Sequence, residues 1–135
     1  MIKLYNSIGN VFFQLEFDEQ KNSVYAYWNG FVTIENVKEG AELVAEMLEQ
    51  THCPNFINVN TDLTGPWESS NDWIQREWTP RAIKGGLKNF AFVVSPNIFG
   101  QLSAMDLNKR LENFDLEMKT FSSLDDAQQW IQSKN

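Results

Sequence analysis

The sequence has one cysteine, Cys53, and one histidine, His52, among its 135 residues. With one cysteine no disulfide can form within the chain, which favours a reducing compartment. The two residues are also too few for a zinc site, which takes about three or four ligands. As a nucleophile and its base they would have to face each other, whereas neighbours on a chain usually point apart. Because Pro54 follows, we expect His52 to end a helix and Cys53 to be a half-buried thiol.

Positive charge and long apolar runs are also scarce. The chain has 11 Lys and Arg against 18 Asp and Glu, which gives a formal net charge of −7. Such a chain repels a phosphate backbone, so nucleic acid is not an expected partner. No apolar run approaches the roughly 20 residues that cross a bilayer, and residues 1–10 lack the basic and apolar regions of a signal peptide. These absences predict a cytoplasmic protein without membrane insertion.

Glycine-rich phosphate loops are absent as well. Gly85 and Gly86 precede an apolar stretch instead of following one, and no nucleotide-binding glycine motif occurs. Asp62, Glu68 and Asp72 could meet around a divalent cation, but turn and capping roles explain Asp62 and Asp72 without one. We therefore expect no cofactor, no metal site and no catalytic residue, and hence a protein that is not an enzyme.

Apolar and aromatic residues, in contrast, are plentiful. They make up 42% and 13% of the chain, enough for a core built largely from rings, and the length fits one domain, residues 1–135. Apolar and polar residues alternate over residues 11–17, and residues 24–28 are β-branched and aromatic. This pattern predicts an antiparallel hairpin, preceded by a short edge strand at residues 2–5.

After the hairpin, helical and strand patterns alternate. A helix is predicted to begin at the cap residue Thr33 and to carry an apolar stripe to Leu48. Gly40 lies within it, which close packing of the helix on a sheet would explain. Further strands are expected at residues 56–59, 90–94 and 114–120, and further helices after Ser69 or Ser70, after Asn97 and after Ser122 or Ser123. The order predicts an α/β fold, a mixed sheet with an N-terminal antiparallel hairpin, βαβ alternation and about four helices.

Residues 56–78 are the stretch of greatest functional interest, with a strand, a polar turn at Asp62 and three of the five tryptophans. Turns at the carboxyl ends of strands are where open α/β sheets place ligands. Trp73 and Trp78 are five residues apart, so on a straight α-helix they cannot both face the same core. One should pack inward while the other, with Trp67, lines a surface crevice or meets another subunit; alternatively all three cover the end of the sheet. Pro80 should end or kink this helix.

Ser69 and Ser70 stand where this second helix is expected to begin. Either residue can cap the helix through its side-chain oxygen. The functional alternative is phosphorylation, because the helix dipole would receive the added charge and the exposed surface would change.

Several segments in order give the chain a family resemblance: YWNGFVT after the hairpin, FINVNTDLTG, WTP, GLKNFAFVVS and FSSLDDAQQWIQ near the end. Together they resemble the SpoIIAA-like family of STAS-like domains, grouped with anti-sigma-factor antagonists and sometimes labelled STAS/SEC14. The resemblance implies a small sheet with helices packed on it and a non-enzymatic role in regulation or binding. The D-S-x-G-like phosphorylation motif of true antagonists is absent, and Ser69 and Ser70 occupy only its general region.

Two functions follow from these features. The first is a STAS-like regulatory or interaction module that binds another protein or a second copy of itself. Its contact surface would span residues 62–78, with Asp62, Trp67, Trp73 and Trp78. The alternative is a carrier of a small apolar ligand or lipid, held in an aromatic crevice at the end of the sheet.

Overall fold

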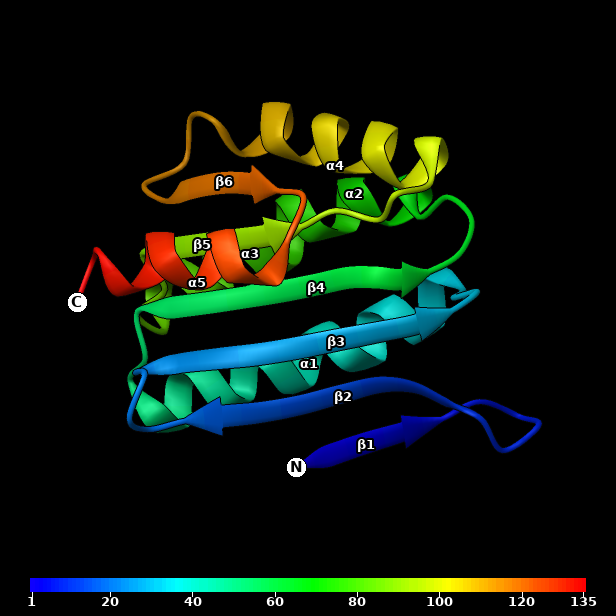
Figure 1. Ribbon diagram of the computed structural model, residues 1–135, viewed down its shortest axis with the longest axis horizontal. Coiled ribbons are helices and arrows are strands. Elements are labelled where there is room, and N and C mark those ends of the chain that lie inside the picture. Colours follow the sequence, from blue (N-terminus) through cyan, green and yellow to red (C-terminus); the bar gives the residue numbers. More distant parts are fainter.

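Six strands lie side by side in chain order in the computed structural model, which describes residues 1–135 (Figure 1). The strands are β1 (Ile2–Tyr5), β2 (Val11–Asp18), β3 (Ser23–Gly30), β4 (Asn55–Leu63), β5 (Asn89–Val93) and β6 (Glu117–Phe121). β1 to β3 pair antiparallel, and β3 to β6 pair parallel. The predicted mixed sheet, with its N-terminal hairpin and following βαβ units, is confirmed.

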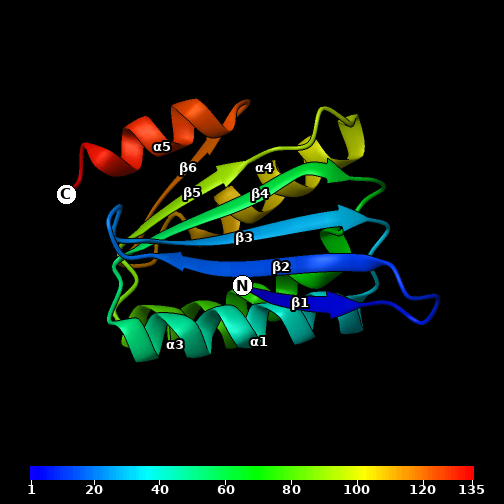
Figure 2. The ribbon, with the colours of Figure 1, turned by 60° about the horizontal axis from the view of Figure 1, so that its bottom comes forward.

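Helices cover both faces of this sheet unequally. They are α1 (Ile34–Thr51), α2 (Asn71–Trp73), α3 (Thr79–Lys84), α4 (Ile98–Leu111) and α5 (Leu124–Gln132). A crossover between parallel strands is almost always right-handed. Each crossover here leads to the next strand on the same side of the sheet, from β3 to β6. The helices in these crossovers, α1, α3 and α4, therefore lie on one face. α5 follows the last strand and packs on the opposite face (Figure 2).

Successive side chains of a strand point to opposite faces of the sheet, so the core is divided between these two faces. On β4, Phe56 belongs to a cluster of 25 buried residues beneath α1 and α4, whereas Ile57 belongs to a cluster of 7 that includes Ala127 and Ile131 of α5. The larger cluster therefore lies between the sheet and the helices that connect its parallel strands.

The predicted helix boundaries are confirmed where side chains cap the ends. The Thr33 hydroxyl accepts from the Asn36 backbone N–H, and the Asn36 side chain accepts in return from Thr33. His52 ends α1 in the left-handed conformation with φ 53°. Asn97 and Ser123 cap α4 and α5 through a side-chain oxygen that accepts from a backbone N–H, without the return bond of a capping box. Each side-chain cap satisfies an N–H that the helix start leaves unpaired.

Residues 68–84, here named the covering segment, differ from the expected helix. The segment begins with a 3₁₀ turn (Glu68–Ser70), and the Ser70 side chain makes no capping bond. Pro80 does not end the helix, because a π turn (Ile74–Trp78) precedes it, in which the Thr79 N–H bonds the Ile74 carbonyl five residues back. Pro80 then falls in the first turn of α3, where its missing N–H is tolerated.

The π turn also changes where the tryptophans point. Its extra residue brings positions five apart toward the same side, so Trp78 is buried and Trp73 is half-buried against the same core. The expectation that these two side chains must diverge was therefore wrong, because it assumed a straight α-helix.

Candidate functional site

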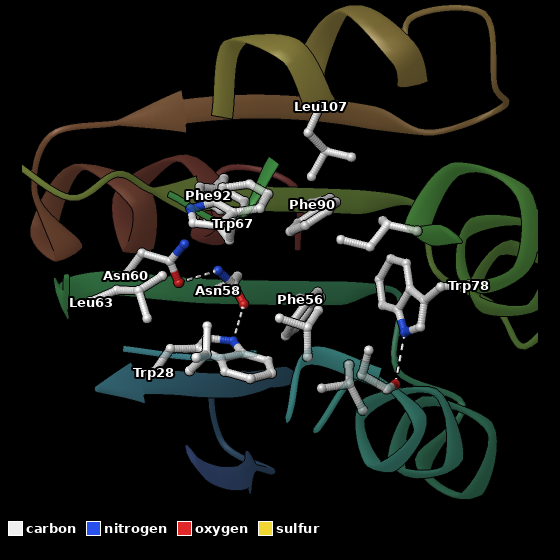
Figure 3. Close-up of a pocket in the computed structure, with 15 residues that line it drawn as sticks. Trp28, Phe56, Asn58, Asn60, Leu63, Trp67, Trp78, Phe90, Phe92 and Leu107 are labelled. Atoms are coloured by element: carbon white, nitrogen blue, oxygen red, sulfur yellow. Dashed lines mark hydrogen bonds between the residues drawn. The ribbon is translucent and has the colours of Figure 1, made fainter. Parts of the chain in front are cut away.

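An apolar cavity lies between the sheet and the helices α1 and α4, beneath the covering segment (Figure 3). Its volume is about 60 Å³, and 13 of its 15 lining residues are hydrophobic. The lining residues are Trp28, Val32, Val37, Ala41, Val44, Phe56, Asn58, Asn60, Leu63, Trp67, Ile74, Trp78, Phe90, Phe92 and Leu107. No charged side chain is among them.

Aromatic rings from neighbouring strands form the floor of this cavity. Phe56 of β4 stacks on Phe90 of β5, with ring centroids 5.1 Å apart, and Trp78 lies 5.9 Å from both. Trp67 stacks on Phe92 at 5.3 Å. These rings are stiff and closely packed, so the shape of the cavity is set by the strand register and by the covering segment.

The three indole N–H groups around the cavity have different environments. Trp78 Nε1 donates to the backbone carbonyl of Ala41 at 2.8 Å, which ties the covering segment to α1. Trp28 Nε1 donates to Asn58 Oδ1, also at 2.8 Å. Trp67 Nε1 is buried and has no partner. An unpaired buried donor is costly, so this group is a natural contact for an acceptor on a bound molecule.

Two buried asparagines, Asn58 and Asn60, are the polar part of the lining. They are 7% and 4% exposed, and Asn58 Nδ2 donates to Asn60 Oδ1 at 2.9 Å. Neither was predicted as a site residue. The signal was present in the strand sequence NFINVN, because asparagine is rarely buried and here occupies alternate positions of an otherwise apolar strand.

Polar contacts also fasten the covering segment to α4 and α1. Asn71 Nδ2 donates to the Ser103 carbonyl and to Asp106 Oδ2, each at 3.0 Å, and this amide donor lowers the pKa of Asp106. Arg81 of α3 pairs with Glu42 and Glu49 of α1, which raises the pKa of the guanidinium. The covering segment is therefore held over the cavity at both sides.

The predicted contact residues occupy different environments. Trp67 and Trp78 are 5% and 4% exposed, so they form the cavity wall and do not lie on an accessible surface. Trp73 is half-buried with the Lys38 ammonium 5.8 Å from its ring centroid, and Asp62 is exposed near the end of β4. A role in partner contact stays a prediction for Asp62 and Trp73.

The two serines also differ in accessibility. Ser69 is exposed, whereas Ser70, also in the covering segment, is 1% exposed. A kinase reaches only an exposed hydroxyl, so phosphorylation stays a prediction for Ser69 and requires local unfolding at Ser70.

The remaining polar candidates do not assemble. Cys53 is buried with Sγ 3.2 Å from the carbonyl oxygens of Asn22 and Asn55, and burial raises the pKa of its thiol, while His52 is exposed. No group of three or more His, Cys, Asp and Glu side chains is placed to hold a metal ion. No helix combines the length and apolar character that a membrane span requires.

Comparison with solved structures identifies the fold. An uncharacterised DUF3478-family protein with a SpoIIAA-like fold from Shewanella loihica PV-4 superposes with a TM-score of 0.55 at 15% sequence identity. The match covers 88% of this chain and 93% of that one. No family model matches the sequence, and no curated protein matches it significantly. The chain therefore has a SpoIIAA-like fold, as its sequence resemblance implied.

Proposed function

We propose that this protein, a SpoIIAA-like fold built over an apolar cavity, binds a small apolar ligand in that cavity. The observation that carries the proposal is the composition of the lining, with 13 hydrophobic residues of 15 beneath Trp67 and Trp78. Ligand sites are commonly apolar hollows with few polar groups, which here are Asn58, Asn60 and the indole N–H groups. The lining has no nucleophile or acid–base side chain, which supports binding without catalysis.

The size of the cavity bears on how a ligand enters. A cavity of roughly 150 Å³ holds benzene in another protein, whereas this one measures about 60 Å³. A ligand of benzene size therefore requires the covering segment to move outward. That segment consists of 3₁₀, α and π turns without a side-chain cap at its start, which makes it the part of the helical layer most easily displaced.

Benzene as a probe tests the proposal in wild-type protein and in two matched variants. Val37→Phe fills the cavity from α1, whereas Leu43→Phe makes a change of similar size on the same helix outside the lining. Because a ligand that binds only the folded state stabilises it, benzene should raise the melting temperature of wild type and Leu43→Phe but not of Val37→Phe. Equal shifts in all three proteins, or no shift in wild type, would count against the cavity as the site.

A second candidate function is self-association through α4, in keeping with the interaction role expected from the resemblance. Ile98, Leu102 and Met105 are 59%, 50% and 65% exposed and are spaced four and three residues apart, so they share one face of the helix. This face belongs to the helix that Asn71 fastens to the covering segment. An exposed apolar stripe of this kind is typical of helix-to-helix contacts.

Light scattering on size-separated protein tests this second candidate. A dimer is expected, strengthened by added salt because the two copies carry a formal charge of −7 each. Leu102→Glu should give a monomer, whereas Gln129→Glu, an exposed position of α5 on the opposite face of the sheet, should leave the dimer intact. A monomeric wild type at high protein concentration would rule out self-association.

A further inference from the structure

Two hydrogen bonds link Trp28, Asn58 and Asn60 across the cavity, and both can run in only one direction from donor to acceptor. An indole N–H can only donate, so Trp28 requires the oxygen of Asn58. The amide nitrogen of Asn58 then points to Asn60 and requires an oxygen there as well. The Trp28 donor therefore fixes which terminal side-chain atom of Asn58 and of Asn60 is oxygen and which is nitrogen. Asn60 takes part in no other side-chain hydrogen bond, so its own N–H groups remain free at the cavity.

A second free donor lies at the same end of the cavity. Trp67 Nε1 has no partner, and its ring stacks on Phe92, which lies opposite Asn58 in the β4–β5 ladder. Asn60 is the next residue of β4 on this face. Figure 3 shows Trp67 Nε1 and Asn60 Nδ2 at the end of the cavity where β4 finishes. Trp67 Nε1 is buried, and Asn60 is 4% exposed as a residue, so its Nδ2 keeps a small contact with water at the edge of the cavity.

These donors determine which chemical group fits beside them. An amine would place donor against donor, and a hydrocarbon would leave both N–H groups unpaired. A carboxylate would accept both bonds, but no positive charge lines the cavity, and an unpaired buried anion is strongly disfavoured. A neutral carbonyl oxygen has two lone pairs, accepts both bonds and carries no charge.

We propose that the cavity selects a small neutral apolar molecule with a carbonyl oxygen, such as a ketone, aldehyde or ester, held by Trp67 Nε1–H and Asn60 Nδ2–H. This inference rests on the proposed function and adds the chemical class of the ligand. The apolar part of the molecule packs on Phe56 and Phe90, and the carbonyl points toward the end of β4.

Cyclopentanone and methylenecyclopentane form a matched pair for the test, because they have the same ring and differ only in oxygen against CH₂. The ratio of their affinities is measured in wild type, in Trp67→Phe and in Asn60→Leu, and comparing ratios between proteins cancels the different hydration of the two compounds. Loss of one hydrogen bond should lower the preference for the ketone roughly tenfold in each variant. Methylenecyclopentane should bind Trp67→Phe about as well as wild type.

Infrared spectroscopy of the wild type gives a readout that does not depend on how the variants fold. The carbonyl stretch of bound cyclopentanone should lie at lower wavenumber than in hexane. An unchanged affinity ratio, or a stretch equal to that in hexane, overturns the carbonyl preference, as it would if a water molecule served these donors instead. If neither compound binds the wild type, the proposed function fails together with this inference.

Discussion

Gly40 lies in the middle of α1, where the absence of a side chain makes room for Trp28. A Cβ at this position would stand 2.5 Å from Trp28 Cη2 and 3.0 Å from Phe13 Cδ1. Both rings are buried, and Trp28 is further held by its bond to Asn58. The close approach of α1 to the sheet, expected from the sequence, therefore occurs where Gly40 faces Trp28 and Phe13.

Gly40→Ala is expected to destabilise the protein although alanine favours the helix. The helical preference contributes about 1 kcal/mol in favour of alanine, and overpacking costs roughly 1–3 kcal/mol. We expect a net loss of about 1 kcal/mol in the free energy of unfolding, measured by urea denaturation, because overpacking prevails. Glu39→Ala, one position away and exposed, is the control and should change stability little. A Gly40→Ala protein as stable as wild type would contradict the contact.

Because of Cys53, we expect the free energy of unfolding to depend on pH in the alkaline range. Burial raises the pKa of its thiol in the folded state, so above the ordinary value of about 8.5 the unfolded chain loses the proton first. The contribution of the Cys53 thiol to the free energy of unfolding is fully present below a pH of about 8.5 and decreases as the pH rises above it.

Urea denaturation at pH 7.5 and 9.5 measures this effect. Wild type should lose more stability between the two values than Cys53→Ala, which has no thiol to titrate. Tyr27, whose pKa desolvation and the nearby Glu16 raise to about 12, is present in both proteins, so its contribution cancels in the comparison. Equal losses in the two proteins would show that the thiol does not contribute.

At the scale of the elements, the covering segment is the least regular part of the helical layer. It joins 3₁₀, α and π turns within residues 68–84, whereas α1 is continuous over 18 residues with a capping box. Helices with few consecutive i to i−4 bonds open at lower free energy.

Hydrogen exchange should therefore be faster in the covering segment than in α1. The proposed ligand should slow exchange in the covering segment, because it binds only when this segment is folded around the occupied cavity and so stabilises the folded segment. Mass spectrometry of peptic fragments, with and without cyclopentanone, measures both effects. Protection of α5 on the opposite face serves as the control and should not change.

The elements also show what the sequence could predict. The strands β1 to β5 and the helices α1, α4 and α5 were predicted because periodicity and cap residues such as Thr33 and Ser123 act locally. β6 begins only at Glu117, although the alternation starts at Phe114. The covering segment was predicted as a plain helix, since no local pattern signals a π turn before Pro80. Its register is fixed by contacts with α1 and α4.

The site was predicted less completely than the fold. Residues 56–78, predicted as the stretch of interest, supply part of the cavity lining, but the sequence left open whether Trp67 and Trp78 lie at a surface crevice or cover the end of the sheet. Asn58 and Asn60 were missed although their strand contains the signal, and Trp28 was missed because its contact with Asn58 depends on β3 lying beside β4. That pairing joins residues about 30 positions apart, and no single segment of the sequence contains it.

For the whole molecule, the strand order explains why the apolar cavity lies beneath the helices. Each parallel connection adds its helix to the same face, so α1, the covering segment and α4 form a layer over β3 to β5. Where three separate helical pieces meet a sheet of large rings, complete filling is difficult, and the hollow forms at their junction. The proposed ligand site is thus formed by the layer and not by any one element.

A crystal structure of the protein grown with saturating cyclopentanone is the decisive test of ligand binding in the cavity. We expect electron density for one molecule inside the cavity, with its oxygen within hydrogen-bond distance of Trp67 Nε1 and its ring on Phe56 and Phe90. A cavity without ligand density in such a crystal would contradict it.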